Sequence, residues 1–175
     1  MAHYGIPNKF ITITQQLYLQ SSCRVIHNGN LTDSFTVETG VRQGCLLSPF
    51  LFLLAVDWIM KTTTAEQNLG IQWTMWSQLE DLDFADDIVL LSTTQAQMQT
   101  KFTKLAKTAA TTGLHINKSK TKVINIDHNT NNTINLDGEA LEEVDTYTYL
   151  GSIVGRDGGS NKDIQARIGK ARTAF

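Results

Sequence analysis

Two adjacent carboxylates, Asp86 and Asp87, are the residues of this 175-residue chain with the clearest capacity for chemistry. In the segment before them, Leu82 and Phe84 alternate with acidic residues, and residues 88–91 after them are entirely apolar. This pattern predicts a tight β-hairpin that carries the acidic pair at its tip. Because adjacent like charges beside apolar strands repel each other, a divalent cation is a natural partner for them.

The segment around the acidic pair also permits other interpretations. An Asp-Asp turn can be purely structural, because aspartate side chains accept hydrogen bonds from nearby backbone groups in turns. The crowding of carboxylates without a Lys or Arg favours a metal site; these residues are Glu80, Asp81, Asp83, Asp86 and Asp87. The pattern Asp81-Leu82-Asp83 leaves open a different metal enzyme, such as a sugar-nucleotide transferase, although no nucleotide-binding βαβ unit precedes it.

A glycine-flanked loop is the second candidate site. Gly44 allows a backbone to approach a ligand closely, Gln43 offers a donor and an acceptor, and Arg42 can bind a phosphate. The loop can equally be an ordinary connection to a helix, because Ser48 is a good N-cap and Pro49 suits the first helical position.

Helical periodicity is expected in four segments that must position these groups. The first three cover residues 8–20, about 49–62 and 95–112, and the last has Ile164, Ile168, Ala171 and Phe175 at helical spacing. The second helix is expected to bury Phe50, Leu51, Leu54, Ala55, Trp58 and Ile59. The third is expected to bury Met98, Phe102, Leu105, Ala106 and Ala109, and to turn Lys101, Lys104 and Lys107 to solvent.

Strand patterns and turn residues predict several hairpins besides the acidic one. Residues 23–27 and 34–39 are expected to pair around Asn28-Gly29-Asn30, and a short strand should precede the Asp137-Gly138 turn. Single strands are expected over residues 70–76, 123–126 and 147–154, the last interrupted by Gly151.

The charges of the chain are segregated. The net charge of −2 argues weakly against a nucleic-acid binder, but six lysines and no acidic residue lie between Lys101 and Lys122. We call residues 101–122 the basic stretch; beside the acidic centre it suits a metal site next to a polyanion, although each lysine alone fits a solvated helix face.

Composition also bears on location. The two cysteines do not make a disulfide framework, the N-terminal residues lack the apolar core of a secretory signal, and the apolar run over residues 49–60 is too short to cross a bilayer. We therefore expect an intracellular protein, nuclear or cytoplasmic, without a membrane partner.

Four motifs follow one another along the chain. They are Val41-Arg42-Gln43-Gly44-Cys45-Leu46-Leu47-Ser48-Pro49, Phe84-Ala85-Asp86-Asp87, Gly113-Leu114-His115-Ile116-Asn117 with Lys120-Thr121-Lys122, and Tyr149-Leu150-Gly151. Their order and spacing resemble the reverse transcriptase domain of non-LTR (LINE-type) retrotransposons, and Tyr4-Gly5-Ile6-Pro7 also looks like that family.

The resemblance implies an α+β fold, in which helices back the antiparallel sheet of a polymerase palm. Residues 1–160 would form a palm with truncated fingers, and residues 161–175 would begin the thumb. It further implies an RNA-directed DNA polymerase, whose partners are an RNA template, a DNA primer and a deoxynucleoside triphosphate. In the intact protein, two Mg²⁺ ions would assist nucleotidyl transfer to the primer 3′ hydroxyl. The sequence indicates no oligomeric state.

The resemblance assigns catalytic roles to three residues. Asp86 and Asp87 would bind the metal, with Asp86 the firmer ligand, and Lys120 would protonate the leaving pyrophosphate. The family's first catalytic aspartate lies upstream of the Tyr-Gly-Ile-Pro segment at which this sequence begins, and Asp57 is not a persuasive substitute. We therefore expect the chain alone to be inactive and its metal binding to be weak or absent.

The resemblance also assigns binding roles. Arg42, Gln43 and Gly44 would lie along the incoming nucleotide and template, and Tyr149, Leu150 and Gly151 would grip the primer end. The alternative is a decayed or co-opted retroelement fragment that binds nucleic acid through the basic stretch without catalysing a reaction.

Overall fold

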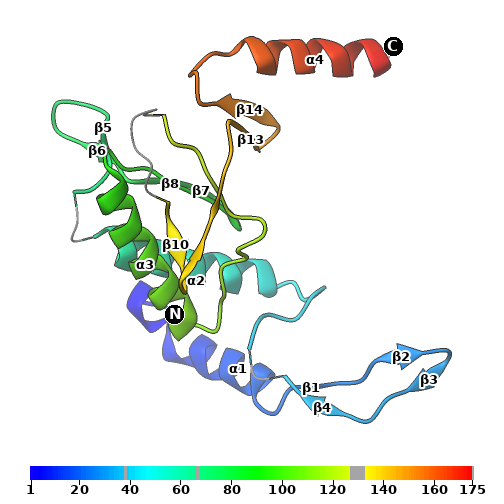
Figure 1. The fold of residues 1–175 in the computed structure, drawn as a ribbon. Helices are drawn as coiled ribbons and strands as arrows, with labels where there is room; N and C mark the ends of the chain where they lie inside the picture. Colours follow the sequence, from blue (N-terminus) through cyan, green and yellow to red (C-terminus); the bar gives the residue numbers. More distant parts are fainter. Residues whose placement is uncertain (38, 66–67, 127–132, 175) are drawn as a thin grey trace.

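Four α-helices and several short strands make up the part of the chain that the computed structural model describes, which is residues 1–37, 39–65, 68–126 and 133–174 (Figure 1). The helices are α1 (Asn8–Tyr18), α2 (Ser48–Thr64), α3 (Gln95–Thr111) and α4 (Asn161–Ala174), after a single 3-10 turn, η1 (Ala2–Tyr4). All four lie where the sequence predicts them, with small differences at their ends. Phe175, which was expected to belong to the last helix, lies outside the described residues.

Helices α2 and α3 pack together and carry most of the core. Their first cluster contains Val56, Ile59, Met60, Leu105 and Ala109, and a second cluster contains Phe102, Ile134, Leu136 and Leu141. The expected apolar stripe of α3 is therefore confirmed.

The expected buried face of α2 is wrong in part. Phe50 is 51% exposed, whereas Val56, Met60 and Thr63 are buried. The helix is apolar around most of its circumference, so periodicity alone does not select the face that meets α3.

The strands pair in separate two-stranded ladders among the described residues. Six ladders are antiparallel: β1 (Ser22–Cys23) with β4 (Phe35–Thr36), β2 (Ile26–His27) with β3 (Asn30–Leu31), β5 (Ile71–Gln72) with β6 (Gln78–Leu79), β7 (Asp81–Phe84) with β8 (Asp87–Leu90), β10 (Asn135–Leu136) with β11 (Glu139–Ala140), and β13 (Thr146–Tyr149) with β14 (Ser152–Gly155). One ladder, β9 (Lys122–Val123) with β12 (Glu142–Glu143), is parallel. The α+β class is confirmed, whereas a continuous antiparallel palm sheet stays a prediction.

Two segments expected as single strands are hairpins. Residues 147–154 turn back at Leu150-Gly151, where both residues have positive φ angles of 48° and 83°. This is the backbone that a two-residue type I′ turn requires, and it also occurs at the expected Asn28-Gly29 and Asp137-Gly138 turns. Residues 70–76 are extended only at β5, after which the chain reverses into β6.

Helix α4 is attached to the last hairpin and lies beyond it at the C-terminal end of the chain (Figure 1). The Asp163 carboxylate accepts a 2.8 Å hydrogen bond from the Ile153 amide, and Arg167 donates to Ser152 at 2.6 Å and to Asp163 at 2.7 Å. None of the helices in the described part of the chain has the length and apolarity needed to cross a membrane.

Candidate functional site

The acidic pair lies at the tip of a hairpin, as the sequence predicts. Phe84 pairs with Asp87 at the end of the β7–β8 ladder, which leaves Ala85 and Asp86 as the two residues of the turn. Ala85 has a positive φ of 56°, a conformation that costs an L-residue about 1–2 kcal/mol. The side chains of Asp86 and Asp87 are exposed. The tip thus presents two neighbouring carboxylates to solvent on a strained turn.

Helix α2 lies beneath this tip. A hollow of about 400 Å³ is lined by Leu53, Val56 and Asp57 of α2 and by Asp83, Phe84 and Ala85 of the hairpin. The carboxylate of Asp57 pairs with Lys61 at 2.8 Å and accepts a 2.5 Å hydrogen bond from the Tyr4 hydroxyl. These bonds, that of Lys61 first, lower the pKa of Asp57, so this carboxylate is already engaged within the fold.

The apolar residues of β7 are exposed to solvent. Leu82 and Phe84 are 42% and 63% exposed, whereas Ile88 and Leu90 of β8 pack against the α2–α3 core. Burial raises the pKa of Asp81, with the charge of Asp83 adding to the effect. The acidic residues of β7 therefore experience one another's charge.

The hairpin β13–β14 meets the acidic hairpin. The Tyr149 hydroxyl donates to the backbone oxygen of Asp87 at 3.5 Å, across 62 residues of sequence. Burial raises the pKa of Tyr149, as do the charges of Asp87 and Asp83. Two segments that the sequence singles out separately are therefore neighbours in the fold.

Arg42 is held by α1 and the segment after it. Its guanidinium lies 5.6 Å from the centre of the Tyr18 ring and donates to the Ser21 hydroxyl at 2.7 Å. Such a cation–π contact with one hydrogen bond restricts a long side chain to one orientation. Gln43 and Gly44 beside it are exposed, and Gly44 has a φ of 81°, which favours glycine.

Ser48 does not have the expected role of N-cap. It is the first residue of α2, Leu47 stands at the N-cap position, and no side-chain hydrogen bond caps the helix. The buried Ser48 hydroxyl instead donates to the Arg42 backbone oxygen at 2.5 Å. This bond fixes the loop against the start of the helix.

Lys120 lies in a turn organised by Asn117. The Asn117 Oδ1 accepts from the Lys120 amide at 3.2 Å and from the Ser119 hydroxyl at 2.8 Å, while the Lys120 side chain is exposed. Within the described ranges, no hydrogen bond or ion pair joins Lys120 or residues 42–44 to the aspartate turn. The loops themselves are ordered by local contacts.

The basic stretch is less available than the sequence suggests. Lys118 pairs with Asp137 at 3.6 Å and with Glu139 at 3.3 Å, and Lys122 pairs with Glu142. These acidic partners follow the stretch in sequence, so a count of charges over residues 101–122 overlooks them.

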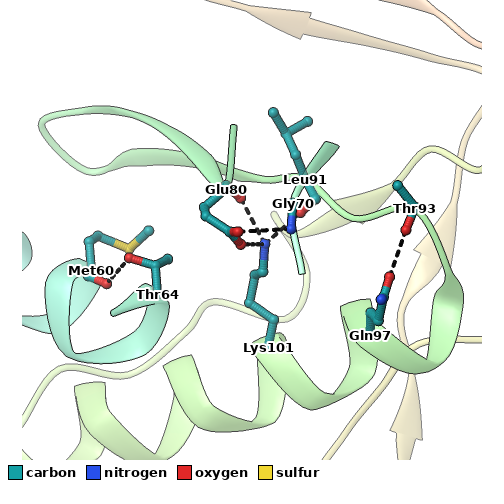
Figure 2. A network of polar contacts seen from close by, with 8 residues as sticks. All are labelled: Met60, Thr64, Gly70, Glu80, Leu91, Thr93, Gln97 and Lys101. Atoms are coloured by element: carbon teal, nitrogen blue, oxygen red, sulfur yellow. Dashed lines mark hydrogen bonds and ion pairs between the residues drawn. The ribbon is translucent and has the colours of Figure 1, made fainter. Parts of the chain in front are cut away.

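Lys101 was expected to face solvent, and this expectation is wrong. Its side chain is 1% exposed and forms an ion pair with Glu80 at 2.6 Å (Figure 2). The helical spacing indicates that Lys101 lies on the buried stripe, because it follows Met98 by three residues and precedes Leu105 by four. The site therefore includes a polar network that sequence analysis missed.

The donor chemistry of the tip fits a hard divalent cation, because carboxylate oxygens are the ligands that Mg²⁺ prefers. Among the residues that the structure describes, however, no group of three or more His, Cys, Asp or Glu side chains is arranged to hold a metal ion. Asp86 and Asp87 can therefore supply part of a coordination shell.

Comparison with known proteins supports the resemblance. Residues 1–154 match the family model described as reverse transcriptase (RNA-dependent DNA polymerase). The Pol polyprotein of the type-2 retrotransposable element R2DM from Drosophila melanogaster is 28% identical over 123 residues, which cover 70% of this chain and 11% of the relative.

Two Pol polyproteins of type-1 retrotransposable element R2 from Popillia japonica also match. One is 23% identical over 161 residues, covering 86% of this chain and 26% of the relative, and the other is 26% identical over 147 residues, covering 78% and 20%. The chain thus spans about a tenth to a quarter of the length of these curated relatives.

Enzymes of the matched family generally use divalent metal ions. The match excludes the sugar-nucleotide transferase interpretation and confirms the resemblance carried by the four motifs: this chain belongs to the reverse transcriptase family, among the reverse transcriptases of non-LTR retrotransposons.

Proposed function

We propose that these residues form the nucleotidyl-transfer part of an RNA-directed DNA polymerase, which adds a deoxynucleotide to the 3′ hydroxyl of a primer. The contact between Tyr149 and Asp87 carries this proposal, because it joins the exposed carboxylates to a hairpin 62 residues later. A polymerase needs its metal-binding carboxylates to lie next to the surface that binds the primer end.

Asp86 and Asp87 would hold the divalent cation. A cation bound there would supply positive charge to the phosphates and make the attacking hydroxyl more acidic. The chain's own contribution is to present two carboxylates side by side, on a turn closed by the Phe84–Asp87 pair. Their mutual repulsion favours occupation by a cation.

Residues of the neighbouring loops would position the substrates. Arg42, oriented by Tyr18 and Ser21, would bind a phosphate, while Gln43 and Gly44 would lie along the nucleotide and the template. The exposed ammonium of Lys120 would stabilise or protonate the leaving pyrophosphate.

The hairpin β13–β14 would bind the primer end next to the carboxylates. Its turn presents Leu150, which is 52% exposed, and Gly151. Helix α4, anchored to β14 through Asp163, would begin the thumb, and residues 1–160 would belong to the palm.

Primer extension tests the proposal. The 175-residue chain and the longest translated product that contains it would be incubated with an RNA template, an annealed DNA primer, deoxynucleoside triphosphates and Mg²⁺. We expect extension by the longer product and none by the chain alone, because no group of three or more His, Cys, Asp or Glu side chains among the described residues is arranged to hold a metal ion.

Variants of the longer product locate the chemistry. Asp86→Asn and Asp87→Asn should each reduce extension by on the order of a thousand-fold, as loss of a group that stabilises charge in the transition state does. Asp33→Asn, in the exposed β2–β4 region, is the matched control and should extend like the unsubstituted product. Full activity of Asp86→Asn would contradict the proposal, and extension by the chain alone would contradict the need for a further carboxylate.

A role confined to nucleic-acid binding through the basic stretch is not favoured. Of its six lysines, Lys101 is buried and Lys118 and Lys122 are paired with carboxylates. The stretch therefore offers a polyanion fewer cations than the sequence suggests.

A further inference from the structure

A buried lysine joins the two strands of the acidic hairpin at their open end (Figure 2). The Lys101 ammonium donates to the Glu80 backbone oxygen at 3.0 Å, to the Glu80 carboxylate at 2.6 Å and to the Leu91 backbone oxygen at 2.6 Å. These three acceptors match the three donors of an ammonium group. The other Glu80 carboxylate oxygen accepts from the Gly70 amide at 2.9 Å.

The bonds fall where the hairpin would otherwise fray. Glu80 immediately precedes β7 and Leu91 immediately follows β8, and the Leu91 amide donates to the Glu80 backbone oxygen at 2.9 Å. This bond extends the ladder by one pair beyond the four of β7 and β8. Lys101, which belongs to α3, therefore holds both strands at one point and ties them to a core helix.

We propose that Lys101 is a positioning residue for the acidic tip: by clamping Glu80 and Leu91 to α3, it fixes the direction in which the hairpin carries Asp86 and Asp87. The catalytic consequence rests on the proposed function, whereas the clamping of the hairpin does not. The tip lies about 17 Å from the clamp at a strand rise of about 3.4 Å per residue, so a small rotation at the open end displaces the carboxylates.

The other contacts of the hairpin are less directional, and near the tip residues 83–85 line an open hollow of about 400 Å³ together with α2. Ile88 and Leu90 pack on the core through apolar contacts, which have no preferred direction, and at the tip Tyr149 adds one 3.5 Å hydrogen bond. An isolated two-stranded hairpin is marginally stable in water. Burying an ion pair is also a poor way to gain stability alone, since apolar residues of similar volume often serve as well. The hydrogen bonds of Lys101 are directional, so they fix the orientation of the hairpin, which apolar residues of similar volume would not do.

Hydrogen exchange of the unsubstituted chain is the first test. If Lys101 clamps the open end, the Leu91 amide should exchange as slowly as the amides of Leu82 and Val89 in the middle of the ladder. Exchange of the Leu91 amide on the order of ten-fold faster than these amides would indicate a frayed end and overturn the proposal.

Variants then separate positioning from stability. Lys101→Met alone leaves the partly buried Glu80 carboxylate without its cation. It is therefore compared with the double variant Lys101→Met/Glu80→Gln, which removes both charges and keeps the acceptor for Gly70. We expect the double variant to recover thermal stability but to keep faster exchange at Leu91. When the double variant is introduced into the longer product, the kcat of primer extension should fall on the order of a hundred-fold with KM unchanged. Lys107→Met, an exposed lysine on the same helix, should have native exchange and kcat.

The outcomes remain distinguishable. Native exchange and native kcat in the double variant would overturn the positioning role even where Asp86→Asn abolishes extension. If the unsubstituted product does not extend a primer, the proposed function fails, and the exchange of the Leu91 amide in the double variant still decides whether Lys101 clamps the hairpin. If the double variant does not fold, exchange of the Leu91 amide on the order of ten-fold faster than that of Leu82 and Val89 in the unsubstituted chain still overturns the clamp.

Discussion

Gly113 at the end of α3 should not tolerate a side chain. It has a φ of 77°, and it lies in a Schellman motif in which the Leu114 amide donates to Ala109 and the Gly113 amide to Ala110, both at 3.1 Å. A Cβ added to Gly113 would also lie 2.9 Å from the Thr39 Cγ2 atom, closer than such atoms approach. Gly113→Ala is therefore expected to destabilise the fold for two separable reasons.

The magnitude follows from these two terms. Forcing alanine into the left-handed region costs about 1–2 kcal/mol, partly offset by the smaller entropy of its unfolded chain, which leaves about 1 kcal/mol. Displacing Thr39 should add about 1 kcal/mol, as mild overpacking does. We expect Gly113→Ala to lower the free energy of unfolding by about 2 kcal/mol.

Urea unfolding of four proteins tests both terms. In a Thr39→Gly background the Cγ2 atom and the Cβ atom, which would lie 3.1 Å from the added Cβ, are both gone, so Gly113→Ala should then cost only about 1 kcal/mol. Equal costs in the two backgrounds would refute the contact between Thr39 and Gly113, and no cost in either would refute the left-handed conformation. The contact matters for the site because Thr39 leads into the loop of Arg42.

Three further predictions concern Tyr4, Ser48 and Ala85. Burial first, and then the hydrogen bond to Asp57, raises the pKa of Tyr4 from 10.0 to about 12. The stability that this contact gives is therefore complete below pH 10 and is lost as the pH rises through about 12. A tyrosinate absorbance titration of Tyr4→Phe should lack the component near pH 12, and an unchanged titration would contradict the contact. Ser48→Ala removes a buried donor to the Arg42 backbone oxygen and should cost about 1 kcal/mol in urea unfolding, while an unchanged midpoint would exclude this bond. Ala85→Gly relieves the positive φ at an exposed position and should stabilise the fold by about 0.5–1 kcal/mol. Primer extension by the longer product should nevertheless fall, because the turn that holds Asp86 becomes less rigid. A variant that is less stable in thermal unfolding would contradict the strain at Ala85.

Local sequence patterns determined the pieces of the site. The alternation before Asp86 and the apolar run after Asp87 predicted the acidic hairpin, and Asn28-Gly29-Asn30 predicted a hairpin turn, because Asn and Gly tolerate positive φ. The stripe of α3 was predicted because its apolar residues fall on one side only. In each case the determining interactions lie within a few residues of sequence.

The tertiary structure decided which faces and side chains these pieces use. It selected the buried face of α2, which is apolar on several sides, and turned Ser48 from an expected cap into a donor to Arg42. It placed Lys101 in the core, where an ion pair with Glu80 and two backbone oxygens compensates the loss of water. It also brought Tyr149 to Asp87. The sequence by itself could not specify these outcomes, because the energy of a buried charge or a distant hydrogen bond depends on partners that only folding brings together.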